Sequence, residues 1–135
     1  MSNEELIETA LKAREFSYSP YSKFKVGAAL LAKNGKVYTG CNIESASYTP
    51  TNCAERTAFF KAVSEGEREF EAIAIAGGYD GVPTEYSYPC GVCRQVMMEF
   101  CNPKSFRIIT AISKEKYLEK TLEEMLPYGF DPSNL

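Results

Sequence analysis

The chain has 135 residues and a formal net charge of −3 at pH 7. This length predicts a single domain over residues 1–135, and 44% hydrophobic residues provide enough apolar surface for a core. The acidic balance, without a run of basic residues, argues against nucleic acid as a partner. No apolar stretch approaches the roughly 20 residues of a membrane span, and the acidic N-terminus lacks the features of a secretory signal.

The cysteine count indicates the compartment. The chain holds five cysteines and no histidine. An odd number of cysteines without a secretory signal is typical of the reducing cytoplasm, where thiols stay free or bind metal. We therefore expect a cytoplasmic protein.

The apolar periodicity predicts helices and strands in an alternating order. In chain order we expect a helix over 3–17, strands over 24–32 and 36–41, a helix over 53–63, a strand over 70–76, a helix over 91–100, strands over 106–112 and 117–120, and a helix over 121–126. Asn34-Gly35 is a hairpin turn signal, and Thr51 or Asn52 is a plausible cap for the second helix. The segments 42–51 and 77–88 are expected to be loops. This order predicts a mixed sheet with helices packed on its faces.

Two short motifs carry the chemistry. Cys53-Ala54-Glu55 and Pro89-Cys90-Gly91-Val92-Cys93 offer three thiol ligands and one carboxylate. A zinc site with three protein ligands leaves a fourth position for water, which is typical of catalytic zinc. Glu55 can then handle the proton of that water. This combination is the signature of zinc-dependent nucleobase deaminases.

Both motifs stand at expected helix starts. The partial positive charge of a helix N-terminus favours the thiolate, the form that binds metal. Arg56 follows Cys53 by three residues, so its guanidinium can lie on the same helix face. We hypothesise that Arg56 donates to a ligand sulfur and offsets the negative charge of three thiolates; the alternative is a surface arginine.

Other interpretations of these residues stay open. Cys90 and Cys93 can form a redox pair, and Glu55 can be a glutamate that merely favours the helix dipole. Cys41 or Cys101 can supply a fourth thiolate, which would make the protein a structural zinc module. The two can equally be small buried hydrophobic residues.

An ordered set of motifs covers nearly the whole chain. They are Ala13-Arg14, Tyr18-Ser19-Pro20-Tyr21-Ser22-Lys23-Phe24, Val26-Gly27-Ala28-Ala29-Leu30, Gly40-Cys41-Asn42-Ile43-Glu44, Cys53-Ala54-Glu55-Arg56-Thr57-Ala58 and Pro89-Cys90-Gly91-Val92-Cys93-Arg94-Gln95. With them the chain resembles the small homotetrameric cytidine deaminases of pyrimidine salvage. Cysteine at position 53 separates it from deoxycytidylate deaminases, polynucleotide editors and tRNA adenosine deaminases, which carry histidine there.

The resemblance implies a fold and a reaction. The fold would be an α/β protein, a three-layer α/β/α sandwich with a five-stranded mixed sheet. The reaction would be hydrolytic deamination of cytidine and 2′-deoxycytidine to uridine and 2′-deoxyuridine, with release of ammonia. The enzyme would be a homotetramer that shares active sites between subunits. A deaminase tuned to a nucleoside analogue or a modified base is the nearest alternative.

The resemblance also implies roles for individual residues. Cys53, Cys90 and Cys93 would hold one Zn²⁺ per subunit, and Glu55 would be the acid and base. Among the substrate contacts, Asn42 and Glu44 would hydrogen-bond a sugar hydroxyl, Phe24 would pack on the pyrimidine, and Phe130 would reach the site of a neighbouring subunit. Turn formation for Asn42 and Glu44, core packing for Phe24 and tail packing for Phe130 are the simpler alternatives. The loop over 77–88 is longer and more aromatic than is usual in the family, and Tyr128-Gly129 replaces a small pair.

Overall fold

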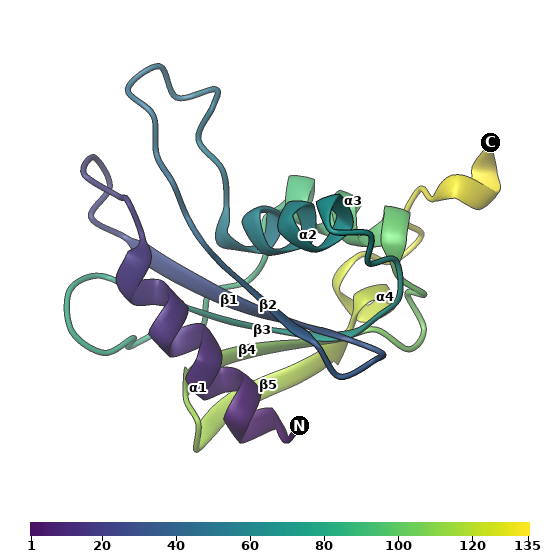
Figure 1. The fold of residues 1–135 in the computed structure, drawn as a ribbon, viewed down its shortest axis with the longest axis horizontal. Helices are drawn as coiled ribbons and strands as arrows, with labels where there is room; N and C mark the ends of the chain where they lie inside the picture. The colour runs from purple at the N-terminus through teal and green to yellow at the C-terminus, as the bar shows by residue number, and fades with distance from the viewer.

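The protein folds around one five-stranded sheet (Figure 1), and the computed structural model describes all residues from 1 to 135. The strands are β1 (Lys25–Ala32), β2 (Val37–Cys41), β3 (Phe70–Gly78), β4 (Arg107–Ser113) and β5 (Lys116–Thr121). Their order across the sheet is β2-β1-β3-β4-β5. β3 and β4 are parallel, and every other neighbouring pair is antiparallel. The predicted mixed sheet is confirmed.

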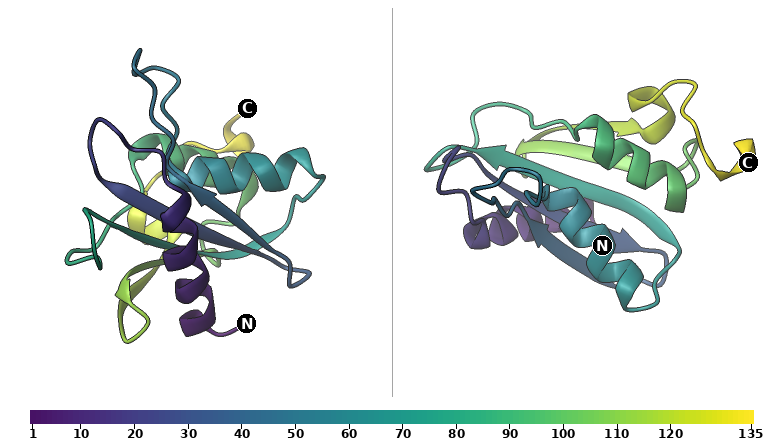
Figure 2. Two further views of the ribbon diagram at one scale, coloured as in Figure 1. Left: turned by 60° about the vertical axis from the view of Figure 1, so that its left-hand side comes forward. Right: turned by 90° about the horizontal axis from the view of Figure 1, so that it is seen from above.

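Helices cover both faces of this sheet. They are α1 (Asn3–Ala13), α2 (Ala54–Ser64), α3 (Gly91–Phe100) and the short α4 (Leu122–Met125), with 3₁₀ turns at Arg14–Phe16 and Pro132–Asn134. Figure 2 shows α2 and α3 next to each other over one face, with α1 on the other. The predicted three-layer α/β/α arrangement is confirmed.

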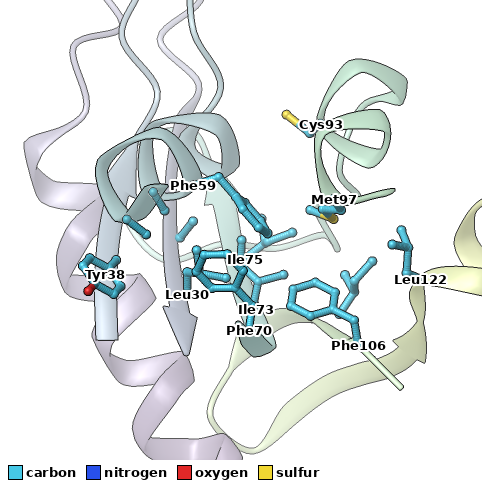
Figure 3. Packing of buried hydrophobic residues seen from close by; sticks show 14 of the residues in the cluster. Leu30, Tyr38, Phe59, Phe70, Ile73, Ile75, Cys93, Met97, Phe106 and Leu122 are labelled. Carbon is cyan, nitrogen blue, oxygen red and sulfur yellow. The ribbon is translucent and has the colours of Figure 1, made fainter. Parts of the chain in front are cut away.

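The two faces of the sheet build two apolar clusters. Successive strand side chains point to opposite faces, so Leu30 and Ile73 enter a cluster of 17 buried residues under α2 and α3, whereas Ile109 joins a cluster of 9 with α1. Phe59 of α2 is fully buried in the larger cluster (Figure 3). Burial of such a side chain contributes about 1.5–3 kcal/mol.

Three local features differ from the sequence prediction. α1 ends at Ala13 and continues as a 3₁₀ turn, a common ending for an α-helix. β3 extends through Gly77 and Gly78, which pair with β1 although glycine is depleted in strands. The cap of α2 is Cys53 itself, and Asn52 instead donates to the Thr57 hydroxyl at 3.2 Å.

The loops that lead into α2 and α3 gather at one end of the sheet (Figure 1). α2 lies very close to β2 because Gly40 has no side chain; a Cβ there would stand 2.3 Å from the Ala54 carbonyl oxygen. The crossover from β3 to β4 contains α3 and the Pro89-Cys90 turn before it. The fold therefore brings the starts of α2 and α3 together. None of the helices is long and apolar enough to cross a bilayer.

Candidate active site

Three cysteines from two separate motifs meet at this end of the sheet. The Sγ atoms of Cys53, Cys90 and Cys93 all lie within 4.8 Å of one another, and those of Cys53 and Cys90 are 3.8 Å apart. Cys93 is buried, Cys53 is half-buried and Cys90 is exposed. Figure 3 shows Cys93 on α3 at the margin of the core, next to Met97. One side of the cluster thus faces the core, and the other is open to solvent.

Two of the three cysteines stand at helix N-termini, and neighbouring side chains set their pKa values. Cys53 is the N-cap of α2, and Cys90 is the N-cap of α3, where its sulfur accepts from the Cys93 backbone N–H at 3.5 Å. The neighbouring Cys93 thiol, assisted by Arg56 and Cys90, lowers the pKa of Cys53 to about 5. The hydrogen bond to Cys53, together with burial, raises the pKa of Cys93. In the metal-free protein, Cys53 is therefore the thiolate and Cys93 stays a protonated thiol.

The cluster has dimensions that fit zinc. Tetrahedral zinc with Zn–S bonds of about 2.3 Å sets sulfur atoms about 3.8 Å apart, which matches the separation of Cys53 and Cys90. Soft thiolates are preferred ligands of this ion. Cys41 and Cys101 are not members of the cluster; burial raises the pKa of each thiol. Three sulfur ligands leave one coordination position free.

Arg56 is the cation closest to the sulfur atoms. Its Nη2 donates to Cys53 Sγ at 3.4 Å, and the hydrogen bond to Cys53 raises the pKa of Arg56. The guanidinium therefore keeps its charge beside the thiolates. This contact is the one predicted from the three-residue spacing, and it places a positive charge where three thiolates would otherwise leave a net negative site.

Glu55 is buried beside the cluster. Glu55 is only 4% exposed, and its carboxylate does not belong to the group of potential metal ligands. Burial, with a smaller contribution from the charge of Cys53, raises the pKa of Glu55 to about 7. A carboxyl group with this pKa can both accept and return a proton near neutral pH. The alternative of a glutamate that merely favours the helix dipole from the surface does not match this burial.

The loop residues Asn42 and Glu44 are held by hydrogen bonds within the chain. The Asn42 side chain donates to the Phe24 carbonyl at 2.7 Å and accepts from the Val26 N–H at 2.9 Å. Glu44 accepts from the backbone N–H groups of Tyr21 and Ser22 at 3.0 and 3.1 Å. The Ser22 hydroxyl lowers the pKa of Glu44, which therefore stays ionised.

Glu44 lines an open cavity of about 330 Å³. The other lining residues are Tyr21, Ser22, Ser45, Tyr48 and Thr51. The cysteines line none of this cavity. In a single chain the carboxylate of Glu44 and the thiol cluster therefore do not line one common cavity.

The two aromatic residues occupy different settings. Phe24 precedes β1 and packs edge-to-face against Tyr79, with ring centroids 5.1 Å apart. Phe130 stands in the C-terminal segment, which projects away from the body (Figure 1), and is 56% exposed. Gln95 of α3 donates to the Phe130 carbonyl at 2.9 Å. This contact ties the C-terminal segment to α3, while the Phe130 side chain stays largely exposed.

Sequence reasoning assigned no role to two arginines that organise the site. Arg94 donates to the carbonyl of Pro89, directly before Cys90, at 2.7 Å, and to that of Met125 at the end of α4. Arg14 is buried and binds carbonyl groups at the ends of β1 and β3. A charged residue on the apolar face of the first amphipathic helix was the available signal for Arg14. Arg94 gave none.

Comparisons with known proteins agree with this geometry. Residues 1–109 match the model of the cytidine and deoxycytidylate deaminase zinc-binding region. A cytidine deaminase of Sporosarcina psychrophila is 50% identical, with 100% of this chain and 96% of the relative covered. One of Halalkalibacterium halodurans is 48% identical, with coverage of 100% and 98%.

Solved structures give the same result. A crystal structure of cytidine deaminase from Burkholderia pseudomallei superposes with a TM-score of 0.86 at 45% identity, covering 96% of this chain and all of that one. Cytidine deaminase from Mycobacterium tuberculosis superposes with a TM-score of 0.81 at 35% identity, with coverage of 96% and 98%. The chain belongs to the zinc-binding family of cytidine and deoxycytidylate deaminases.

Proposed function

We propose that this protein hydrolyses the C4 amino group of cytidine and 2′-deoxycytidine, giving uridine or 2′-deoxyuridine and ammonia. The observation that carries the proposal is a buried carboxyl group, Glu55, beside three clustered thiols with one coordination position to spare. Cytidine deaminases that are 50% and 48% identical over the full chain support the same reaction.

Cys53, Cys90 and Cys93 would hold one zinc ion through their sulfur atoms. Zinc in such a position supplies a water that is deprotonated near pH 7. Arg56 keeps one of its N–H groups on Cys53, so that part of the thiolate charge is neutralised by the protein. The start of α2 and the start of α3 stabilise the remaining charge.

Glu55 moves the protons. In its ionised form the carboxylate takes a proton from the attacking water, and it then donates to N3 of the pyrimidine. The Glu55 carboxylate then takes the remaining proton from the hydroxyl group added at C4 and delivers it to the amino nitrogen. The C4–N bond breaks, ammonia leaves and the C4 carbonyl of the uracil ring forms. A pKa of about 7 suits both directions, because the group is then neither a permanent acid nor a permanent base.

The sugar and the ring would be held by loop residues. Glu44 has acceptor capacity beyond the contacts made by Tyr21 and Ser22, and the Asn42 amide has a second N–H to donate. Together they suit an alcohol, which is both donor and acceptor. Phe24 would pack on the pyrimidine. The carboxylate of Glu44 disfavours a phosphate on the sugar, so free nucleosides are the substrates.

We propose further that the enzyme is a homotetramer in the cytoplasm. Phe130 is 56% exposed and Tyr128, two residues before it, is fully exposed, so both rings are available to a neighbouring subunit. Exposed Phe60 and Val92 on α2 and α3 provide apolar surface for subunit contacts. Sedimentation of a species four times the mass of one chain is the expected result. Unpaired thiols at the site favour a reducing compartment.

Ammonia release tests the reaction directly. Zinc-loaded protein mixed with cytidine is expected to release ammonia, and chelated protein is expected to release none until zinc is returned. Cytidine monophosphate, tested in parallel, should turn over far more slowly. A zinc-loaded, folded protein that leaves cytidine intact would contradict the proposed function.

A further inference from the structure

Arg14 is buried in an unusual set of partners. The residue is 9% exposed, and its guanidinium donates only to backbone carbonyl groups. These belong to Lys25 at 2.9 Å, Gly78 at 3.0 Å, Gly81 at 2.7 Å, and Tyr79. Three segments are joined in this way: the start of β1, the end of β3, and the loop that follows β3.

This arrangement fixes the course of the backbone after β3. No carboxylate forms an ion pair with Arg14, because the nearby Asp80 pairs with Lys25 Nζ at 3.1 Å. Burial of a guanidinium is favourable only when its N–H groups are satisfied, and here strand-end carbonyls satisfy them. The planar fork of arginine can reach these directions at once, whereas lysine cannot. These bonds tie the backbone of residues 78–81 to the Arg14 guanidinium.

Tyr79 carries this constraint to Phe24. The two rings meet edge-to-face, with centroids 5.1 Å apart and planes at 84°. The Phe24 ring also borders Gly77; a Cβ there would stand 3.0 Å from Phe24 Cε1. Asn42 holds the Phe24 carbonyl at 2.7 Å. The backbone of Phe24 is thus anchored by Asn42, and the tilt of its ring is set by Tyr79.

We propose that Tyr79, positioned by Arg14, is a specificity-determining residue that sets the affinity of the site for the pyrimidine ring through Phe24. The inference rests on the proposed function, which assigns Phe24 to the pyrimidine. Tyr79 is 65% exposed, so its ring contributes little to the core. Its effect is therefore expected on substrate binding and not on folding.

Replacement of the Tyr79 ring tests the proposal. Tyr79→Leu is expected to raise KM for cytidine about two- to tenfold, the range for loss of one aromatic pair, with kcat within about twofold. The same variant should bind uridine, the product, more weakly by a similar factor in calorimetry. Tyr79→Phe keeps the ring and should restore most of both. Tyr86→Leu removes a tyrosine of the same loop that packs on Tyr88 instead, and serves as the matched control.

Arg14→Lys tests the positioning step. It is expected to raise KM in the same direction as Tyr79→Leu, and combining the two changes should add little because both act on the Phe24 ring. A lower melting temperature with an unchanged KM would show that Arg14 only stabilises the fold and does not position Tyr79 for substrate binding. Unchanged KM and uridine affinity in Tyr79→Leu would overturn the role of Tyr79. A wild-type protein that released no ammonia would instead contradict the proposed function.

Discussion

The site has two halves that are built in different ways. The chemical half consists of Glu55 and the three cysteines, and it rests on the N-termini of α2 and α3, which pack on the sheet. In our proposal the substrate half consists of Phe24, Asn42, Glu44 and Phe130, which stand on loops or on the C-terminal segment. The chemistry is thus supported by one chain's core, whereas substrate binding depends on loop contacts and, in our proposal, on a second chain.

The largest expected effect falls on the chemical half. Cys93→Ala removes the buried ligand, so we expect loss of zinc and a fall in turnover of at least about 10³-fold, because metal affinity depends on the full ligand set. Metal analysis and ammonia release measure the two losses. Cys101→Ala is the matched control, since this thiol lies outside the cluster. A Cys93→Ala variant that keeps its full zinc content would contradict the assignment of Cys93 as a zinc ligand.

The burial of Glu55 predicts how stability varies with pH in the metal-free protein. Its folded pKa of about 7 is raised from an ordinary value of 4.5. Below pH 4.5 both folded and unfolded chains hold the proton; between pH 4.5 and 7 only the unfolded chain releases it, so this contribution to stability is lost as pH rises. As pH rises across that window, the free energy of unfolding of wild type should fall by about 3 kcal/mol relative to that of Glu55→Gln. Parallel urea unfolding curves of both proteins measure the difference. A constant difference would show that Glu55 is not buried as a neutral acid.

Replacement of Arg56 is expected to have an effect of intermediate size, smaller than the two above and larger than changes in the substrate contacts. Arg56→Gln removes the cation from Cys53, and we expect turnover to fall about tenfold, the equivalent of about 1.4 kcal/mol. Arg68→Gln, beyond the end of α2, is the control. Unchanged turnover together with unchanged zinc affinity would reduce Arg56 to a surface arginine.

Substitutions in the substrate half should change KM alone, and their effects on activity should be the smallest of those predicted. Phe130→Ala is expected to raise KM for cytidine several-fold and to leave the melting temperature of the subunit unchanged, because the ring is largely exposed. Leu135→Ala, in the same segment, should leave KM unchanged. Mixed tetramers of Phe130→Ala and Glu55→Gln subunits would then report whether the ring serves its own chain. Equal KM values for wild type and Phe130→Ala would remove the ring from the site.

The same division explains what the sequence could predict. The thiol cluster and Glu55 were predictable because two motifs at helix starts encode them with only local spacing, and the sheet follows from apolar periodicity. The position of Arg14 on the apolar face of the first helix indicated burial, but its partners were not predictable, because they are backbone carbonyls that carry no side-chain signal. Gly77 and Gly78 were expected in a loop; pairing with β1 overrides their low strand propensity.

The cap of α2 illustrates the same limit. Asn52 has the better capping propensity, yet Cys53 occupies the N-cap position. A helix that began one residue earlier would turn the first thiol away from Cys90, with which its sulfur now stands at 3.8 Å. Tertiary assembly of the cluster therefore decides the boundary, and propensity does not.

In our proposal the three cysteines hold the metal and Glu55 moves the protons. The most direct measurement is the turnover of Glu55→Gln, made on a sample with its zinc content and uridine affinity determined. We predict a loss of about 10²–10⁴-fold in kcat, with one zinc per chain and uridine binding retained. Turnover close to that of wild type, in a variant that keeps its zinc, would contradict the assignment of Glu55.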